Sequence, residues 1–215
     1  MYRFVICWFI VTLMPSSGLT TSGDGAEGSR SGFRLTRPDL TILGATIGSS
    51  EKSDILHQLG PAPVFRASQT QGSDDLVCYR AAQEGDDTVV AFHFGPLGGW
   101  IDLTEISISR ATELSWSVKK CGHSEQISRN LQFLRGLHLG ASPEDVARSL
   151  GPGRSLKGNR LKYYGSHHCP QQTAAKPQGN GTRGDADVCE IVDSVEIKFT
   201  DGRMSFASFY EFVDR

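Results

Sequence analysis

The sequence predicts an α+β protein made of two tandem modules, each a short helical segment packed on an antiparallel sheet of three to four strands. Two observations lead to this prediction. A segment at residues 47–61 reappears at residues 139–152 once one residue is gapped, and matching strand patterns follow both copies. Because self-similarity along a chain indicates a repeated structural unit, each copy should form the same substructure.

Both copies of the repeated segment carry the signals of a short helix. Ser50 and Ser142 stand where a side-chain oxygen can accept a backbone N–H bond at a helix start. The apolar residues that follow fall on one side of a helix and would pack on a sheet. Gly60 and Gly151, each followed by proline, permit the left-handed conformation that ends a helix. We therefore expect one short helix in each module, ending at these glycines.

Three strand candidates follow each predicted helix. The first of the three contains tyrosine, the second alternates apolar and polar residues, and the third follows a glycine-containing turn. They are expected at residues 76–79, 90–94 and 100–108 in the first copy, and at 161–164, 195–199 and 203–212 in the second. A helix would cover one face of each sheet and leave the other face open to solvent or to a partner.

The N-terminal region has the layout of a secretory signal. Arg3 precedes an apolar run, residues 4–14, which is followed by small residues. This run is shorter than the roughly 20 residues of a spanning helix, so we expect no stable membrane span. The predicted organisation is a signal peptide at residues 1–18, a flexible leader at 19–32, a first module at 33–120 and a second module at 121–215.

The cysteines favour disulfide bonds. Cys7 lies in the signal, and the remaining even number in an exported protein is typical of a bridged scaffold. Three pairings are possible. The preferred one places a bridge in each module, Cys78–Cys121 and Cys169–Cys189. The second bridge would close a Gly-rich loop and stabilise the fold by roughly 3 kcal/mol in the chain-entropy model.

Aromatic side chains on the open face are the candidate binding residues, because Trp and Tyr dominate the binding energy of protein interfaces. Tyr163 and Tyr164 are adjacent, so a strand must point one of them to each side. His93 lies in the middle of a predicted strand and faces away from its apolar neighbours. The predicted binding residues are Tyr79, His93, Trp100, Tyr163 and Tyr164.

A metal site is the most specific chemical alternative to a binding surface. The run His167-His168-Cys169, with Cys189 later, offers the imidazole and thiolate ligands that zinc prefers. Adjacent histidines seldom point at one ion, however, and bridged cysteines are not available as ligands. An imidazole such as that of His93 could act as an acid or a base, but no serine or carboxylate stands at a spacing that indicates a catalytic triad. We predict no catalytic residue, no metal and no cofactor.

The repeated segment also resembles two known families. Its pattern, Gly-x-Ser-x-x-(x)-Asp-(Ile/Val)-x-x-x-Leu-Gly-Pro followed by a Tyr-bearing strand, is similar to the tandem helix-plus-sheet modules of the β-lactamase inhibitory protein family. It is also similar to the single module of the small outer-membrane lipoprotein of the barrel-assembly machinery. The resemblance covers most of residues 37–215 and implies a non-enzymatic binder with an aromatic-rich concave sheet surface. The chain lacks the lipoprotein's cysteine placement, and no inhibitor contact residue can be matched.

Net charge narrows the class of partner. The formal net charge of −2 provides no strong field for nucleic acid, so we expect no nucleic-acid partner. The predicted function is a secreted or periplasmic, non-enzymatic, inhibitor-like binding module that recognises a protein or cell-envelope component through an open sheet face. Two alternatives stay open: a metal-dependent hydrolase using His167 or His168, and a structural component of the envelope.

Overall fold

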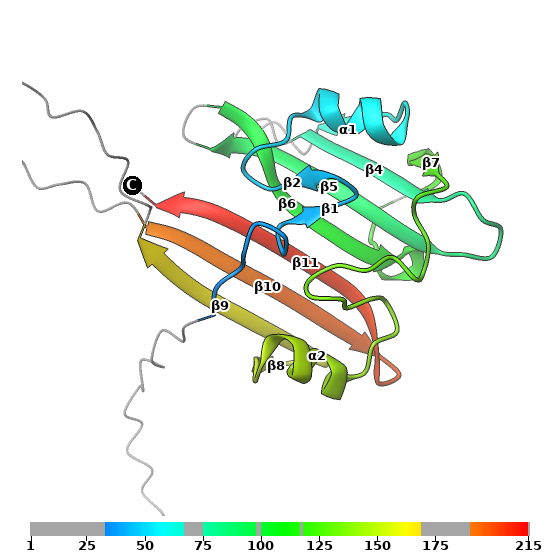
Figure 1. The fold of residues 1–215 in the computed structure, drawn as a ribbon. Coiled ribbons are helices and arrows are strands. Elements are labelled where there is room, and N and C mark those ends of the chain that lie inside the picture. Colours follow the sequence, from blue (N-terminus) through cyan, green and yellow to red (C-terminus); the bar gives the residue numbers. More distant parts are fainter. Residues whose placement is uncertain (1–32, 67–74, 98–99, 117, 169–189, 215) are drawn as a thin grey trace, which may run out of the picture.

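The computed structural model describes residues 33–66, 75–97, 100–116, 118–168 and 190–214. Within these residues the protein has an α+β fold that consists mainly of strands. Two helices, α1 (Lys52–Leu59) and α2 (Pro143–Leu150), lie on the same face of one large sheet (Figure 1). Neither helix is long and apolar enough to cross a membrane. The predicted signal peptide and leader, and the Cys169–Cys189 bridge, lie outside the described residues.

In the described part of the chain the large sheet contains nine strands, in the order β3-β4-β5-β6-β11-β10-β9-β8, with β7 beside β4. The β4–β7 pair is parallel, and all the other neighbouring pairs are antiparallel. A separate hairpin joins β1 to β2. The strands are β1 (Thr41–Ile42), β2 (Ala45–Thr46), β3 (Val64–Arg66), β4 (Asp75–Ala81), β5 (Thr88–Leu97), β6 (Trp100–Arg110), β7 (Gly122–Ser124), β8 (Arg154–Leu156), β9 (Arg160–His168), β10 (Glu190–Thr200) and β11 (Arg203–Asp214).

All six strands predicted from the sequence are present as β4, β5, β6, β9, β10 and β11. The strands that were not predicted are only two or three residues long, too short for the alternation of apolar and polar residues to be recognisable. We call β3–β6 the first half of the sheet and β8–β11 the second half. The two halves meet where β6 pairs with β11, at a register centred on Ser107 opposite Ser208.

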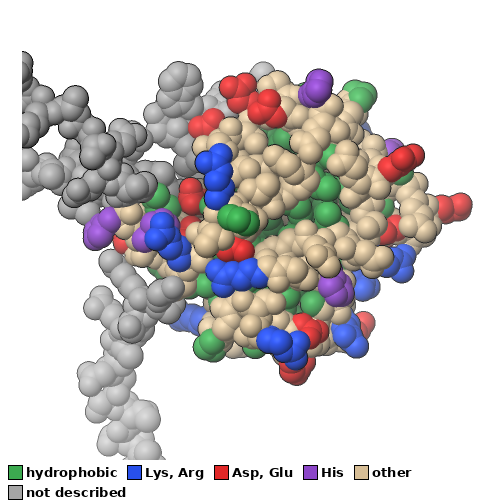
Figure 2. Space-filling view, viewed as in Figure 1, with side chains coloured by type: hydrophobic (Ala, Val, Ile, Leu, Met, Phe, Trp, Pro, Cys, Tyr) green, Lys and Arg blue, Asp and Glu red, His purple; other side chains and the backbone are tan. Residues whose placement is uncertain are grey.

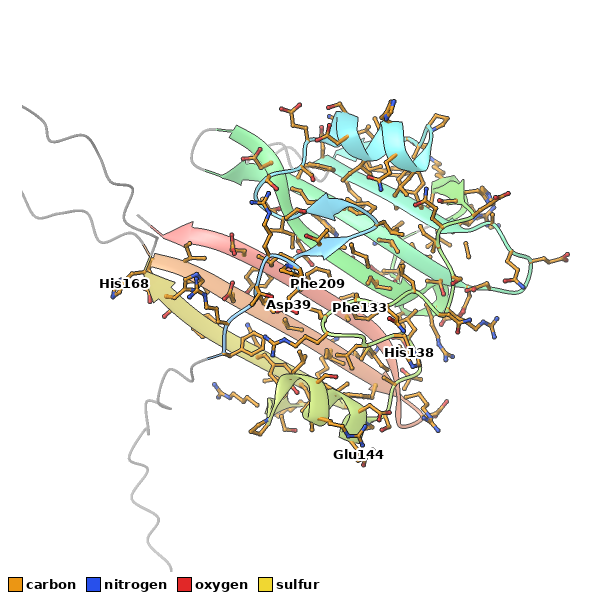
Figure 3. The ribbon with its side chains drawn as sticks, viewed as in Figure 1. Asp39, Phe133, His138, Glu144, His168 and Phe209 are labelled. Atoms are coloured by element: carbon orange, nitrogen blue, oxygen red, sulfur yellow. A yellow bond between two sulfur atoms is a disulfide. The ribbon has the colours of Figure 1, made fainter. Side chains whose placement is uncertain are left out.

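One continuous apolar core fills the space between the sheet and the elements on its helix face, meaning the face toward α1 and α2. Alternate strand residues point into it, among them Phe92, Val195 and Phe209. The N-terminal strap, residues 33–40, and the segment 125–141 complete this layer. In Figure 3, Phe133 of that segment lies over Phe209 of β11, and the two rings are stacked with centroids 6.5 Å apart. Figure 2 shows charged side chains of both signs spread over this face.

The helix starts were predicted correctly in one copy only. Ser142 caps α2 and its side chain accepts the Asp145 backbone N–H, as expected. The prediction for α1 was wrong by one residue, because Glu51 is its N-cap and forms a capping box with Asp54. Ser50 is buried instead, and its hydroxyl accepts the Thr46 backbone N–H at 2.9 Å. A serine used to close the preceding turn is not available to cap the helix.

The helix ends fall at the predicted glycines but with a different conformation. Gly60 has φ 93° and ψ 176°, and Gly151 has φ 83° and ψ −171°. These angles lie in an extended region at positive φ that is essentially restricted to glycine, rather than in the left-handed helical region that the sequence suggested. The chain therefore leaves each helix in an extended direction and enters the short strand that follows it.

Candidate binding face of the sheet

The face of the sheet opposite the helices, here called the back face, is divided into two unlike halves. In the first half, residues 111–116 and 118–121, here called the cover, lie across β4 and β5, and Leu114, Trp116 and Val118 pack on a small buried cluster. That cluster consists of Cys78, Val89, Ala91 and Cys121. We call this region the covered half of the back face.

A disulfide fixes the cover in place. Cys78 of β4 is bonded to Cys121, with the two Cα atoms 4.9 Å apart. This confirms the predicted bridge within the described residues. Directly after it, β7 pairs with β4, so the cover is held by a covalent bond and by backbone hydrogen bonds at the same point. Residues 122–124 therefore pack with the first half of the sheet.

No described segment lies across the rest of the back face, which we call the open half. It consists of the outward side chains of β6 and of β8 to β11. The strand register places Tyr164, Ser194, Tyr210 and Glu105 in one row, because each lies directly opposite the next on the neighbouring strand. Their chain neighbours, such as Tyr163 and Val195, are buried on the helix face, so alternation directs this row to the back face.

The open half is hollowed between large side chains. A cavity of about 310 Å³ lies over the middle of β10 and β11. Ser194 and Ser208 are small and buried at its floor, whereas the walls are longer charged and aromatic residues. The cavity is lined by Glu105, Glu113, Arg160, Lys162, Ser194, Glu196, Lys198, Phe206, Ser208 and Tyr210.

An exposed tyrosine and a buried serine mark the open half. Tyr164 is 45% exposed and is one of only two large apolar side chains, among the described residues, that are classed as exposed. Ser194, which lies between Tyr164 and Tyr210, is fully buried, and its hydroxyl has no hydrogen-bond partner within the described part of the chain. A buried polar group without a partner carries a desolvation cost that a ligand can remove.

Ion pairs hold some walls of the cavity in fixed positions. Arg160 contacts Glu196 at 2.8 Å, and Lys198 contacts Glu113, which belongs to the cover of the neighbouring half. Hydrogen bonds from Lys198 and Thr200 lower the pKa of Glu113 to about 2. The long side chains on this side of the cavity are therefore ordered before any partner binds.

The predicted binding residues do not all reach the open half. The prediction is wrong for Tyr79 and Tyr163, which are buried in the core, where desolvation raises the pKa of each phenol. Their hydroxyls donate to the carbonyl oxygens of Gly60 at 2.6 Å and Gly151 at 3.1 Å, so each tyrosine fastens the end of a helix to the sheet. The alternation of side chains along a strand correctly predicted which residues share a face of the sheet. It does not indicate which of the two faces the helix covers.

The other predicted binding residues lie on the back face or have side chains outside the described residues. Tyr164 belongs to the open half. His93 is half-buried and lies directly across from Glu105 at the border between the two halves. Trp100 begins β6, but its side chain lies outside the described residues.

The histidines of the metal alternative point to opposite faces. His167 and His168 are consecutive in β9, and His167 approaches Asp193 on the helix face, with Nδ1 3.5 Å from Oδ2. In Figure 3, His168 lies at one end of the sheet and His138 near the other. Within the described residues, no three or more His, Cys, Asp or Glu side chains are placed to hold a metal ion.

An acidic pair on the helix face, formed by Asp193 and the half-buried Glu211, was not predicted from the sequence. Asp193 is fully buried and accepts the Leu35 backbone N–H at 2.9 Å, which ties the N-terminal strap to β10. Glu211 lies directly opposite it on β11. Burial raises the pKa of both carboxyls, and the charge of Asp193 raises that of Glu211 further. The available signal was an aspartate at a core position of the β10 alternation, two residues before Val195.

Comparison with known proteins adds no assignment, since no family model, no curated protein and no solved structure matches this chain.

Proposed function

We propose that the chain is an exported, non-enzymatic binding protein that recognises a protein or cell-envelope partner through the open half of the back face. The observation that carries the proposal is the contrast across one sheet face. The covered half hides its apolar strand residues beneath a disulfide-anchored segment. The open half instead presents a hollow with Tyr164 exposed beside it. Exposed tyrosine next to a concave, partly charged surface is typical of protein recognition.

The proposal includes two tandem modules joined at the β6–β11 pair. The strand order supports it, because the third matching strand of one copy, β6, pairs antiparallel with the third matching strand of the other, β11, and the remaining strands follow in reverse order on each side. A twofold relation between the halves produces this kind of self-complementary pairing.

Equivalent contacts in the two halves support the same view. Backbone N–H groups of Gly48 and Gly140 donate to the carbonyls of Leu103 and Met204, both at 2.8 Å. The two buried tyrosines likewise bond to the glycines that end the two helices. Such a tandem arrangement agrees with the resemblance to the β-lactamase inhibitory protein family, although no target is inferred from it.

A secreted or periplasmic location belongs to the same proposal. The Cys78–Cys121 bond persists in oxidising compartments and is rarely found in the reducing cytosol. The basic and apolar start of the sequence adds to this argument, because it has the composition of an export signal.

The test is affinity capture with matched variants of the oxidised protein. Wild type, Tyr164→Ala and the control Glu144→Ala, an exposed residue on α2, are immobilised and exposed to secreted and envelope proteins of the source organism. We expect one set of proteins to be retained by wild type and by the control and lost with Tyr164→Ala. Retention that is equal on all three, or absent from all three, contradicts the proposed function.

A further inference from the structure

We propose that the open half binds an acidic segment of a protein partner, whose carboxylates lie beside Arg154 and Lys162. This inference rests on the proposed function and names the chemistry of the partner. It begins from two like charges at the outer edge of the sheet. Arg154 of β8 lies directly opposite Lys162 of β9, on the back face. Like charges directly opposite each other destabilise a sheet.

Neither cation is neutralised by a described carboxylate. No ion pair is formed by Arg154 or Lys162 within the described residues, whereas Arg160 and Lys198 nearby each have one. The closest acidic neighbour of Lys162 in the register is Glu196, and Arg160 already contacts it at 2.8 Å. An anionic group from outside the protein would relieve the repulsion between the two cations, and it would gain two charge-assisted contacts.

Positive charge is in excess at one end of the open half, although the whole chain is slightly acidic. The chain carries a formal net charge of −2. At the β8 end of the open half, however, four basic side chains stand beside two acidic ones. These are Arg154, Arg160, Lys162 and Lys198, beside Glu113 and Glu196. Complementary charge of this kind directs encounter with an acidic partner and rejects basic ones.

The hollow next to the cations provides a hydrogen-bond donor. The Ser194 hydroxyl lies at the floor without a partner in the described residues, between Tyr164 and Tyr210. A carbonyl or carboxylate oxygen that parts the two tyrosines would accept this bond. The aromatic rings would then flank the partner's side chain, which adds apolar contact to the charge attraction.

A protein segment fits this surface better than a continuous polyanion. Glu105 and Glu196 line the same cavity as Lys162. A polyanion such as nucleic acid or a sulfated polysaccharide would bring its charges close to both carboxylates. A protein segment can place acidic residues near β9 and neutral or basic residues near β6, so it satisfies both sides of the cavity.

In the experiment, two capped peptides of equal length are each added in increasing amounts to the oxidised protein. NMR follows the chemical shifts of its backbone amides. One peptide alternates Glu with Tyr, and the other has Gln in place of Glu. We expect saturable shifts in residues 160–164 and 194–198 with the Glu peptide. Binding should be roughly tenfold weaker for the Gln peptide and for the Arg154→Gln/Lys162→Gln variant, as two exposed ion pairs allow. Ser194→Ala should weaken it less. Lys119→Gln, an exposed charge change on the cover, is the matched control and should bind like wild type.

Several outcomes overturn the inference. Equal binding of the two peptides, or unchanged binding by the double variant, excludes an acidic segment at this site. Tighter binding of heparin or of a single-stranded oligonucleotide would assign the patch to polyanions instead. Failure here is separable from failure of the proposed function. If captured proteins depend on Tyr164 but not on Arg154 and Lys162, the binding face stands and only the acidic chemistry is wrong.

Discussion

The two halves of the back face begin from similar strands and end as different surfaces. In the covered half, small and apolar side chains such as Val89 and Ala91 are buried beneath the cover. In the open half, the corresponding positions are serines at the floor and charged residues around it. One sheet face is therefore buried in one half and open in the other, according to the side chains that alternate outward. Three experiments test how far this contrast extends.

The largest effect should follow from releasing the cover. The Cys78–Cys121 bond joins residues 43 apart in sequence, a loop for which the chain-entropy model gives about 4 kcal/mol of stabilisation. We expect the Cys78→Ala/Cys121→Ala variant to lose stability of that order in urea denaturation. It should also bind a hydrophobic dye more strongly, because the apolar strand residues beneath the cover become accessible. An unchanged denaturation midpoint would show that the cover is held without the bridge.

A pair of aromatic substitutions compares the two halves directly. Trp116 packs on the buried cluster of the covered half, so Trp116→Ala should lower the free energy of unfolding by about 2 kcal/mol, less than a fully buried tryptophan would. Tyr164 is exposed, and Tyr164→Ala should change stability by less than about 0.5 kcal/mol. Chemical denaturation of both variants measures the difference. Equal losses would mean that the open half is as much a core as the covered half.

The smallest effect concerns the carboxylate that joins the two halves. Glu113 of the cover has its pKa lowered to about 2 by hydrogen bonds from Lys198 and Thr200, from an ordinary value of 4.5. Because the pKa of Glu113 is lower in the folded state, the unfolded chain takes up a proton at a higher pH than the folded protein does. The contribution of Glu113 to the free energy of unfolding is therefore complete above pH 4.5 and is lost as the pH falls toward 2.

Discounted for solvent screening, Glu113→Gln should cost about 1 kcal/mol at pH 7. The difference in unfolding free energy between wild type and variant should stay constant from pH 7 to about pH 4.5 and narrow from there to pH 3. A gap that does not depend on pH would mean that the side chain acts through packing and not through its charge.

Local patterns predicted much of the fold and less of the site. Alternation located the six long strands, and the capping serine and glycines located α2 almost to the residue. Alternation also separated the faces of Tyr163 and Tyr164. It could not reveal which face the helices would cover, so Tyr79 was placed among the binding residues although it is a core residue.

The remaining errors have a common physical cause, which is contact between residues far apart in sequence. No local sequence pattern indicates that the cover folds back over β4 and β5, or that Glu113 contacts Lys198 of β10. The uncompensated pair of Arg154 and Lys162 likewise exists only once β8 is aligned with β9. A pair of charges that depends on strand register cannot be predicted before the register is known.

The pairing of β6 with β11, here called the seam, has a consequence for the rate of folding. Most other strand pairs of the sheet join neighbours along the chain, as hairpins do, and can form within one half. The seam alone brings together long strands from distant parts of the sequence, and the core on the helix face closes over it. Because long-range pairing must overcome the entropy of closing a large loop before its contacts stabilise it, we expect this step to limit the rate. During that delay β6 and β11 expose their unpaired edges, so the interval before they pair is when the chain is most prone to self-association.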